Sequence, residues 1–167
     1  MRRMLGGVIL ILACLTTGQV TSQAADFPTA KLLPVALAVE AAQAAMAVCQ
    51  KQNFHISVAV TDQAGLVRVL LRDEKAGPHT LDSSTKKAYT AASFGLPTAA
   101  LMKIVLTHPD AASLADINER ILILPGGFPI MVGTEVVGAI GVGGTPGNDT
   151  DEACAKAGLD AIADRLK

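Results

Sequence analysis

The three histidines are the residues of this chain whose chemistry suits holding a metal ion or moving a proton. His55 opens a predicted strand, and His79 and His108 fall in predicted loops beside helices. Imidazole is a common metal ligand and changes its charge near neutral pH. No two histidines have the spacing of a helical metal site, and no Cys-x-x-Cys motif occurs, so we do not expect a structural zinc site. His79 and His108 stay as candidate single ligands, against the alternative that both are solvated loop residues.

The motifs of common catalytic sites do not occur in the sequence. There is no Gly-x-Ser-x-Gly, and the adjacent carboxylates Asp73 and Glu74 fall in a polar loop with no sign of burial. The glycine-rich run over 141–147 lacks the Gly-Lys-Ser/Thr of a phosphate loop, so it predicts a tight turn before a helix. We assign no catalytic residue and do not expect an enzyme.

Two other groups of residues suit ligand binding. Lys86 and Lys87 lie on the polar face of a predicted helix, where they either meet solvent or pair with an anionic ligand. Gly126 and Gly127 follow a proline between apolar segments. Such a glycine pair makes a bend, or lets a ligand approach the backbone closely to form a pocket wall. The residues alone leave both alternatives open.

Hydrophobic periodicity and turn residues predict helices over 35–50, 80–94, 97–107 and 149–166, a helical turn over 111–118, and strands over 56–61, 66–71, 121–124, 128–132 and 135–142. Asp62 to Gly65 reads as a hairpin turn. The order αββααβββα predicts one α/β (α+β) domain, with an antiparallel sheet of about five strands flanked by helices.

The first 25 residues have the pattern of a secretory signal peptide. Arg2 and Arg3 precede a short apolar run over 4–15, and small residues lead to a cleavage site after Ala24 or Ala25. The apolar run is shorter than the roughly 20 residues of a membrane span. We therefore expect a mature domain over 26–167 that is periplasmic or secreted. The alternative is a lipoprotein anchored through Cys14, because 11–14 loosely resembles a lipobox.

The charge of the mature chain argues against nucleic acid as a partner. Removing Arg2 and Arg3 leaves 12 of the 14 basic residues against 15 acidic ones, a net charge of −3. No basic stripe is present to neutralise phosphates, and base stacking is poorly supplied by a chain without Trp and with Tyr89 as its single Tyr.

Two cysteines follow the signal segment, Cys49 and Cys154, each on a predicted helix. An exported compartment permits a disulfide between them, which we favour over two buried thiols.

Several short motifs together resemble the GlcG/HbpS-like heme-binding protein family over about 33–166. They are Val58–Asp62 with Gly65, Lys87–Ala91 leading to Pro97-Thr98, Gly126–Ile130 with Gly138–Val142, and Asp151–Cys154 with Ala157–Leu159. The resemblance implies an antiparallel sheet flanked by helices and a homo-oligomer. It also implies heme as the small-molecule ligand, with roles in heme or iron sensing, storage or handling.

The resemblance itself transfers no ligand position, so the iron ligand is chosen by side-chain chemistry: we expect His79 or His108 at the iron, and Lys86, Lys87 and Arg120 at the heme propionates. Gly126, Gly127 and Phe128 are expected to form the pocket wall.

Two departures from the family pattern stand out. Gly143 replaces a common Ser, and Thr85 falls in a stretch that is often acidic in iron-linked members, which weakens an iron-sensor reading. The alternative function is a small enzyme or an organic-cofactor module, for example a corrinoid-related one, that uses the same pocket without heme.

Overall fold

The computed structural model describes residues 25–167. The predicted signal peptide and the alternative anchor at Cys14 lie outside the described residues. The strands are β1 (Ser57–Asp62), β2 (Val67–Arg72), β3 (Gly127–Val132) and β4 (Glu135–Gly143), and the helices are α1 (Val35–Lys51), α2 (His79–Phe94), α3 (Thr98–Thr107) and α4 (Asn148–Ile162), with 3-10 helices η1 (Pro109–Asp116) and η2 (Ala163–Arg165).

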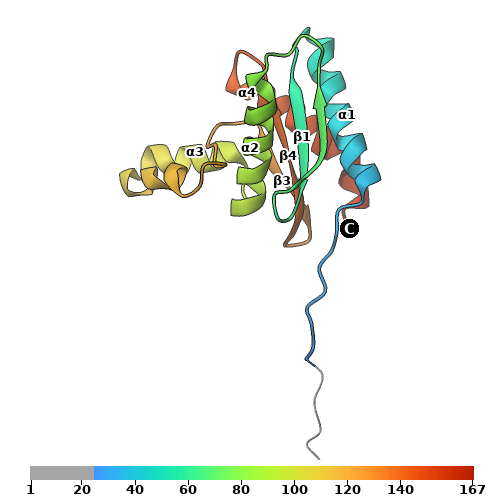
Figure 1. The fold of residues 1–167 in the computed structure, drawn as a ribbon, viewed down its shortest axis with the longest axis vertical. Helices are drawn as coiled ribbons and strands as arrows, with labels where there is room; N and C mark the ends of the chain where they lie inside the picture. Colours follow the sequence, from blue (N-terminus) through green and yellow to red (C-terminus); the bar gives the residue numbers. More distant parts are fainter. Residues whose placement is uncertain (1–24) are drawn as a thin grey trace, which may run out of the picture.

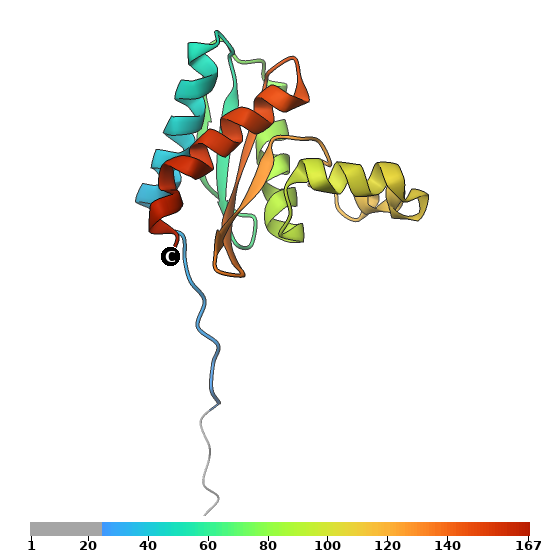
Figure 2. The ribbon, with the colours of Figure 1, turned by 180° about the vertical axis from the view of Figure 1, so that it is seen from behind.

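The four strands form one antiparallel sheet in the order β2-β1-β4-β3, with helices on both faces. Helices α1 and α4 lie side by side on one face, and α2 lies on the other (Figures 1 and 2). The main hydrophobic core fills the space between the sheet and the α1–α4 pair. The predicted α+β class and antiparallel sheet are confirmed.

The predicted fifth strand over 121–124 is wrong. This apolar segment runs as a half-buried loop, in which the backbone N–H of Leu122 donates to Oγ1 of Thr90 on α2 at 2.8 Å. Its backbone is therefore tied to a helix instead of a strand, and β3 stays at the edge of the sheet. Four apolar residues fit either arrangement, because a run that short has no period of its own.

Small residues allow α2 to pack closely on the sheet. A Cβ at Gly127 would lie 2.5 Å from the carbonyl O of Lys87, and one at Gly141 would lie 2.5 Å from the backbone N of Ala88. The contact between this helix and the sheet is completed by a cluster of buried alanines, Ala91, Ala92 and Ala139.

One buried ion pair joins α2 to the end of the sheet and to α4. Lys87 Nζ donates to Asp151 Oδ2 at 2.7 Å and to the carbonyl O of Val142 at 2.9 Å. Asp151 Oδ1 in turn accepts from the backbone N–H of Thr145 at 3.1 Å. Lys87 is 1% exposed. A buried charge needs such a full set of partners, because desolvation otherwise outweighs the attraction.

The disulfide predicted between Cys49 and Cys154 is confirmed. It joins α1 to α4, with the two Cα atoms 5.8 Å apart and a sequence separation of 105. Both residues are fully buried in the main core.

Residues 98–117, which contain α3 and η1, form a projection that we call the arm. It extends away from the sheet and its flanking helices (Figures 1 and 2). Its apolar side chains include Leu106 and Ile117, which are 72% and 65% exposed. Within residues 25–167 no single helix is long and apolar enough to cross a membrane; α2 and α3 pass that test only as a pair bent by 75°.

Candidate functional site

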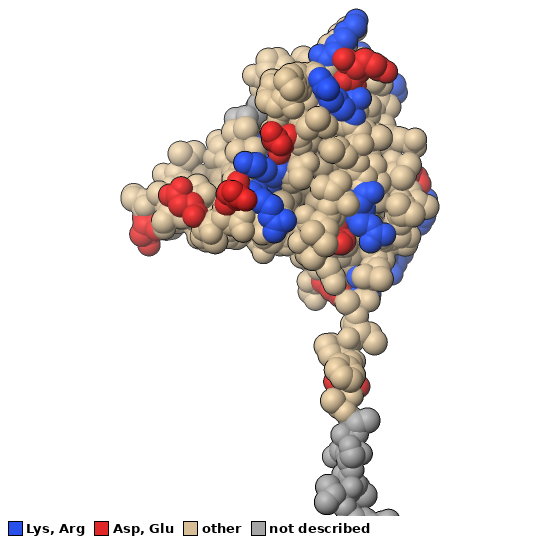
Figure 3. Space-filling model, in the orientation of Figure 1, with Lys and Arg blue, Asp and Glu red and all other residues tan. Residues whose placement is uncertain are grey.

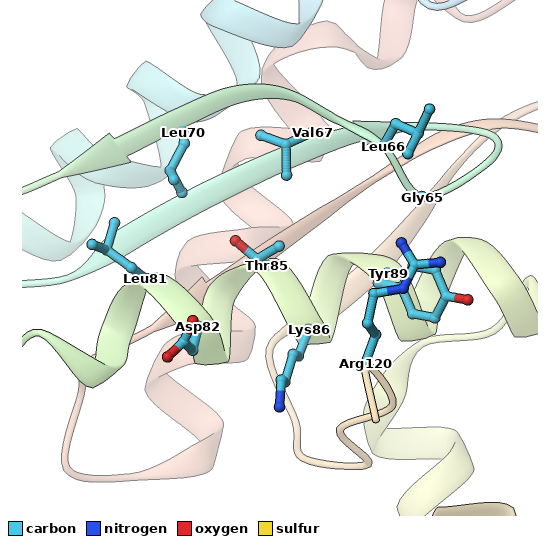
Figure 4. A pocket seen from close by; sticks show the side chains of 10 residues that line it. All are labelled: Gly65, Leu66, Val67, Leu70, Leu81, Asp82, Thr85, Lys86, Tyr89 and Arg120. Carbon is cyan, nitrogen blue, oxygen red and sulfur yellow. The ribbon is translucent and has the colours of Figure 1, made fainter. Parts of the chain in front are cut away.

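A groove with a cavity volume of about 400 Å³ lies between β2 and α2. Figure 4 shows Val67 and Leu70 pointing from the strand toward the helix, and Leu81 and Thr85 pointing back toward the strand. The lining residues are Gly65, Leu66, Val67, Leu70, Leu81, Asp82, Thr85, Lys86, Tyr89 and Arg120. The volume is within the range of small-molecule sites, and the surface that lines the groove is mainly apolar, as such sites require.

The groove exists because α2 does not cover the whole sheet. The helix packs mainly over β4, β1 and β3 and meets β2 only weakly. Since β2 is an edge strand, the side chains on its α2 face have no layer above them. Leu66, Val67 and Leu70 are accordingly 58%, 44% and 42% exposed, which is high for side chains of this size.

Tyr89 and Arg120 close one end of the groove. The guanidinium carbon of Arg120 lies 3.8 Å from the centre of the Tyr89 ring, a cation–π contact. Gly65 has a left-handed backbone (φ 73°), and a side chain there would overlap the Tyr89 ring. The β1–β2 turn therefore holds the ring in place, with the Ala64 and Leu66 N–H groups donating to the Asp62 carboxylate.

Three charged residues, Asp82, Lys86 and Arg120, belong to the lining of the groove. Asp82 and Lys86, four residues apart, lie on the outer side of α2, and Arg120 lies at the far end (Figure 4). The lining of the groove thus includes two cations and one carboxylate beside the apolar side chains. This arrangement suits a flat apolar molecule that carries acidic groups.

The sequence-predicted binding residues divide into two sets. Lys86 and Arg120 line the groove. Lys87, Gly126 and Gly127 instead pack together beneath α2: the site of a Gly126 Cβ is 3.1 Å from Lys87 Nζ, and that of Gly127 is 2.8 Å from Thr98 Cγ2. Phe128 packs against the main core on the other face of the sheet.

The histidines lie outside the groove. His79 is the exposed first residue of α2, and His108 is exposed on the arm, after the end of α3. In the described part of the chain, no cluster of three His, Cys, Asp or Glu side chains is close enough to hold a metal ion. The two candidate ligands lie on different elements, at the start of α2 and after the end of α3.

His55 has a structural partner in Asp73, with its Nδ1 2.8 Å from Asp73 Oδ1. The Gln50 side chain and the Lys75 backbone N–H also donate to this carboxylate, each at 3.0 Å. Hydrogen bonds from Gln50 and Lys75, followed by that of His55, hold the pKa of Asp73 below its ordinary value. This network joins α1 to the end of β2 and is not part of the groove.

Sequence reasoning missed Tyr89 and the apolar side chains of the groove. In the sequence, Tyr89 is notable only as the single tyrosine, and no motif marks it as a binding residue. The signal in the strand was available, because Val67 and Leu70 belong to the apolar run predicted as a strand over 66–71. What the sequence did not show was that α2 covers this strand only weakly.

The geometry is that of a small α+β domain with an open groove, of a volume typical of small-molecule sites, beside an edge strand. Residues 33–160 match the model of a family described as haem degrading protein HbpS-like. The chain therefore belongs to the HbpS-like family, as its motifs predicted.

Known proteins and structures agree with this assignment. An uncharacterized 15.0 kDa protein from the dhaT-dhaS intergenic region of Citrobacter freundii is 31% identical over 134 residues, 79% of this chain and 93% of that protein. A double-mutant HbpS from Streptomyces reticuli superposes with a TM-score of 0.78 at 37% identity, covering 86% of this chain and 95% of that one. The fold is also similar to PduOC solved in complex with heme, with a TM-score of 0.73 at 21% identity over 79% of this chain and 96% of that chain.

Proposed function

We propose that this protein is exported and binds heme in the groove between β2 and α2. The observation that carries the proposal is a groove whose lining combines the apolar side chains of Val67, Leu70 and Leu81 with the cations Lys86 and Arg120. Heme combines a flat apolar macrocycle with two carboxylates, so both halves of the ligand find suitable partners. The family description supports the same ligand. Sensing, storage and handling of heme are all compatible with such a site.

Export is supported by the disulfide and by the predicted signal peptide. Disulfides persist in oxidising compartments and are rare in reducing ones. We propose a periplasmic or secreted location, with the lipoprotein as the alternative.

The proposal is tested by titrating hemin into the purified protein and following the Soret absorption. We expect a saturable shift with a midpoint in the micromolar range or below. Lys86→Glu should weaken binding by about three-fold, because one exposed ion pair is worth less than about 1 kcal/mol. Lys156→Glu is the matched control, since Lys156 pairs with Asp160 on α4, away from the groove. A wild-type protein that shows no saturable shift contradicts heme binding.

A second candidate is an organic-acid or organic-cofactor module that works without iron. It is favoured by one observation: none of the described residues lining the groove is His, Cys or Met, and Tyr89, the one lining residue of a type that ligates heme iron, has its ring in contact with the Arg120 guanidinium. Native mass spectrometry of the protein as purified separates the two candidates. A retained heme supports the first, and a retained iron-free organic acid supports the second.

A further inference from the structure

Arg120 lies over the face of Tyr89 with its side-chain hydrogen-bond donors unused. The guanidinium carbon is 3.8 Å from the centre of the ring, so the two groups are in contact. Arg120 makes its hydrogen bond through the backbone N–H, which donates to Oδ1 of Asn118 at 2.8 Å. No ion pair in the described part of the chain includes Arg120. A guanidinium that stacks on a ring keeps the five N–H donors in its plane free for a partner at its edge.

Two contacts from other segments fix the position of this pair. The loop that carries Arg120 is tied to α2, because the backbone N–H of Leu122 donates at 2.8 Å to Oγ1 of Thr90, the residue after Tyr89. On the strand side Gly65 lies against the ring, and a Cβ there would overlap Cδ2 of Tyr89. The guanidinium is therefore held in one place before any ligand arrives (Figure 4).

The second cation of the lining is close to this pair along α2. Lys86 lies three residues before Tyr89, so the two side chains are neighbours on one side of the helix. Like Arg120, Lys86 belongs to no ion pair among the described residues. Figure 4 shows Arg120 against Tyr89 at one end of the lining, and Leu70 and Leu81 at the other. A flat ligand whose acidic groups share one edge thus fits in one orientation.

We propose that Tyr89 is a positioning residue, which holds Arg120 where it receives a carboxylate of the ligand, and that Gly65 makes room for the Tyr89 ring. This inference rests on the heme-binding function proposed above, with the heme propionates as the carboxylates. Both propionates lie on one edge of the macrocycle, so that edge faces Arg120 and the opposite edge faces Leu70 and Leu81. Holding the arginine in advance strengthens binding, because a free side chain loses rotamer freedom when it pairs with a ligand.

The first test compares two ligands that differ only in their acidic groups. Hemin and hemin dimethyl ester are titrated into each protein in one aqueous–organic buffer, and the ratio of the two affinities is measured. Lost apolar contact with the macrocycle weakens both ligands alike and cancels in this ratio. We expect the wild type to prefer the acid about ten-fold, Arg120→Gln to lower that preference about five-fold, and Tyr89→Leu to lower it about three-fold.

The conservative variant of the first test is Tyr89→Phe. It keeps the ring face and should retain the wild-type ratio. Equal ratios in the wild type and Tyr89→Leu overturn the positioning role of Tyr89. Equal ratios in the wild type and Arg120→Gln overturn carboxylate binding by Arg120.

The second test asks whether Tyr89 acts through Arg120. If it does, Tyr89→Leu/Arg120→Gln lowers the preference for the acid no further than Arg120→Gln alone, because the ring has nothing left to hold. Lys86 provides the control pair. The effects of Tyr89→Leu and Lys86→Gln should be independent, so that their fold-changes multiply. Fold-changes that also multiply for Tyr89 and Arg120 contradict the proposal.

The third test uses two glycines with the same backbone conformation. Gly65 and Gly133 have φ of 73° and 62°, so alanine is strained to a similar degree at each. A Cβ at Gly65 meets the Tyr89 ring, whereas one at Gly133 has no atom within 4 Å. We expect Gly65→Ala to lower the preference for the acid as Tyr89→Leu does, and Gly133→Ala to keep it, with both titrated below their thermal midpoints. A Gly65→Ala protein with the wild-type ratio contradicts the role of Gly65.

The ligand-free protein offers a direct signal from the contact. Tyr89 is the single tyrosine and the chain has no Trp, so the tyrosine band of the near-ultraviolet circular dichroism reports on this ring alone. We expect Arg120→Gln to change the band and Lys86→Gln to leave it as in the wild type. Identical bands in the wild type and Arg120→Gln overturn the contact. A wild type that binds neither hemin nor its ester removes the proposed function as a whole, whereas one that binds both equally well removes only this inference.

Discussion

Two adjacent lysines on α2 have opposite environments. Lys86 lines the groove, and Lys87 is buried against Val142 and Asp151. Successive helical positions are about 100° apart, so one of two neighbours can face the sheet while the other faces outward. The sequence identified both as cations on one polar helix. Which of them is buried depends on Asp151, which is 64 residues away in the sequence.

Removing one partner of this pair should be costly. We predict that Asp151→Ala lowers the free energy of unfolding by about 3–5 kcal/mol, because Lys87 is left as an uncompensated buried charge. Urea unfolding with the disulfide intact measures this. The double variant Lys87→Met/Asp151→Leu should lose much less than the sum of the two single changes. Additive losses would show that the two charges do not depend on each other.

The carboxylate of Asp73 should make the free energy of unfolding depend on pH in the acid range. Its pKa is below the ordinary value in the folded state, mainly through hydrogen bonds from Gln50 and Lys75. The folded protein then binds fewer protons than the unfolded chain, so the stabilisation is complete above the ordinary pKa of about 3.9. It is lost as the pH falls through the lower, folded pKa.

Asp73→Asn should therefore flatten the change in urea midpoint between about pH 5 and pH 2. Its exposed neighbour provides the control, and Glu74→Gln should leave the wild-type slope. An Asp73→Asn protein with the wild-type slope would contradict this assignment.

At the scale of elements, the position of α2 depends on glycines in the sheet beneath it. We predict that Gly141→Ala destabilises the protein by about 1–3 kcal/mol, since the added methyl group meets the backbone of Ser84 and Ala88. Gly147→Ala is the matched control, because the nearest atom to a Cβ there is 3.9 Å away. Thermal unfolding of both variants measures the difference. Equal thermal midpoints for the two variants would mean that α2 does not pack this closely on the sheet.

The elements were predictable from local patterns, and their partners were less so. Gly65 and Asp62 define the β1–β2 hairpin through a turn that needs a left-handed residue, and the structure has that turn. The run at 121–124 is as apolar as a strand, and its partner, Thr90, lies on a helix. The groove has the same origin, because it depends on which strand α2 leaves uncovered. Which segments pair as strands, and which strand a helix covers, depend on contacts between residues far apart in the sequence. No short window of sequence contains that information.

At the scale of the whole molecule, the disulfide closes most of the domain into one loop. In the chain-entropy model a bridge across 105 residues stabilises the folded state by roughly 4–5 kcal/mol. We predict that Cys49→Ala/Cys154→Ala lowers the thermal midpoint clearly, and that dithiothreitol has the same effect on the wild type and none on the variant. A wild type that keeps its midpoint when fully reduced would contradict this prediction.

The central claim is that heme occupies the groove between β2 and α2, and one comparison of hemin affinities tests it most directly. Leu70→Arg places a charged side chain among the apolar residues that line the groove, and Leu32→Arg makes the same change at an exposed residue before α1. The account predicts that Leu70→Arg weakens hemin binding at least about ten-fold, or 1.4 kcal/mol, while Leu32→Arg binds as the wild type does. Equal hemin affinity in the wild type and Leu70→Arg would contradict it.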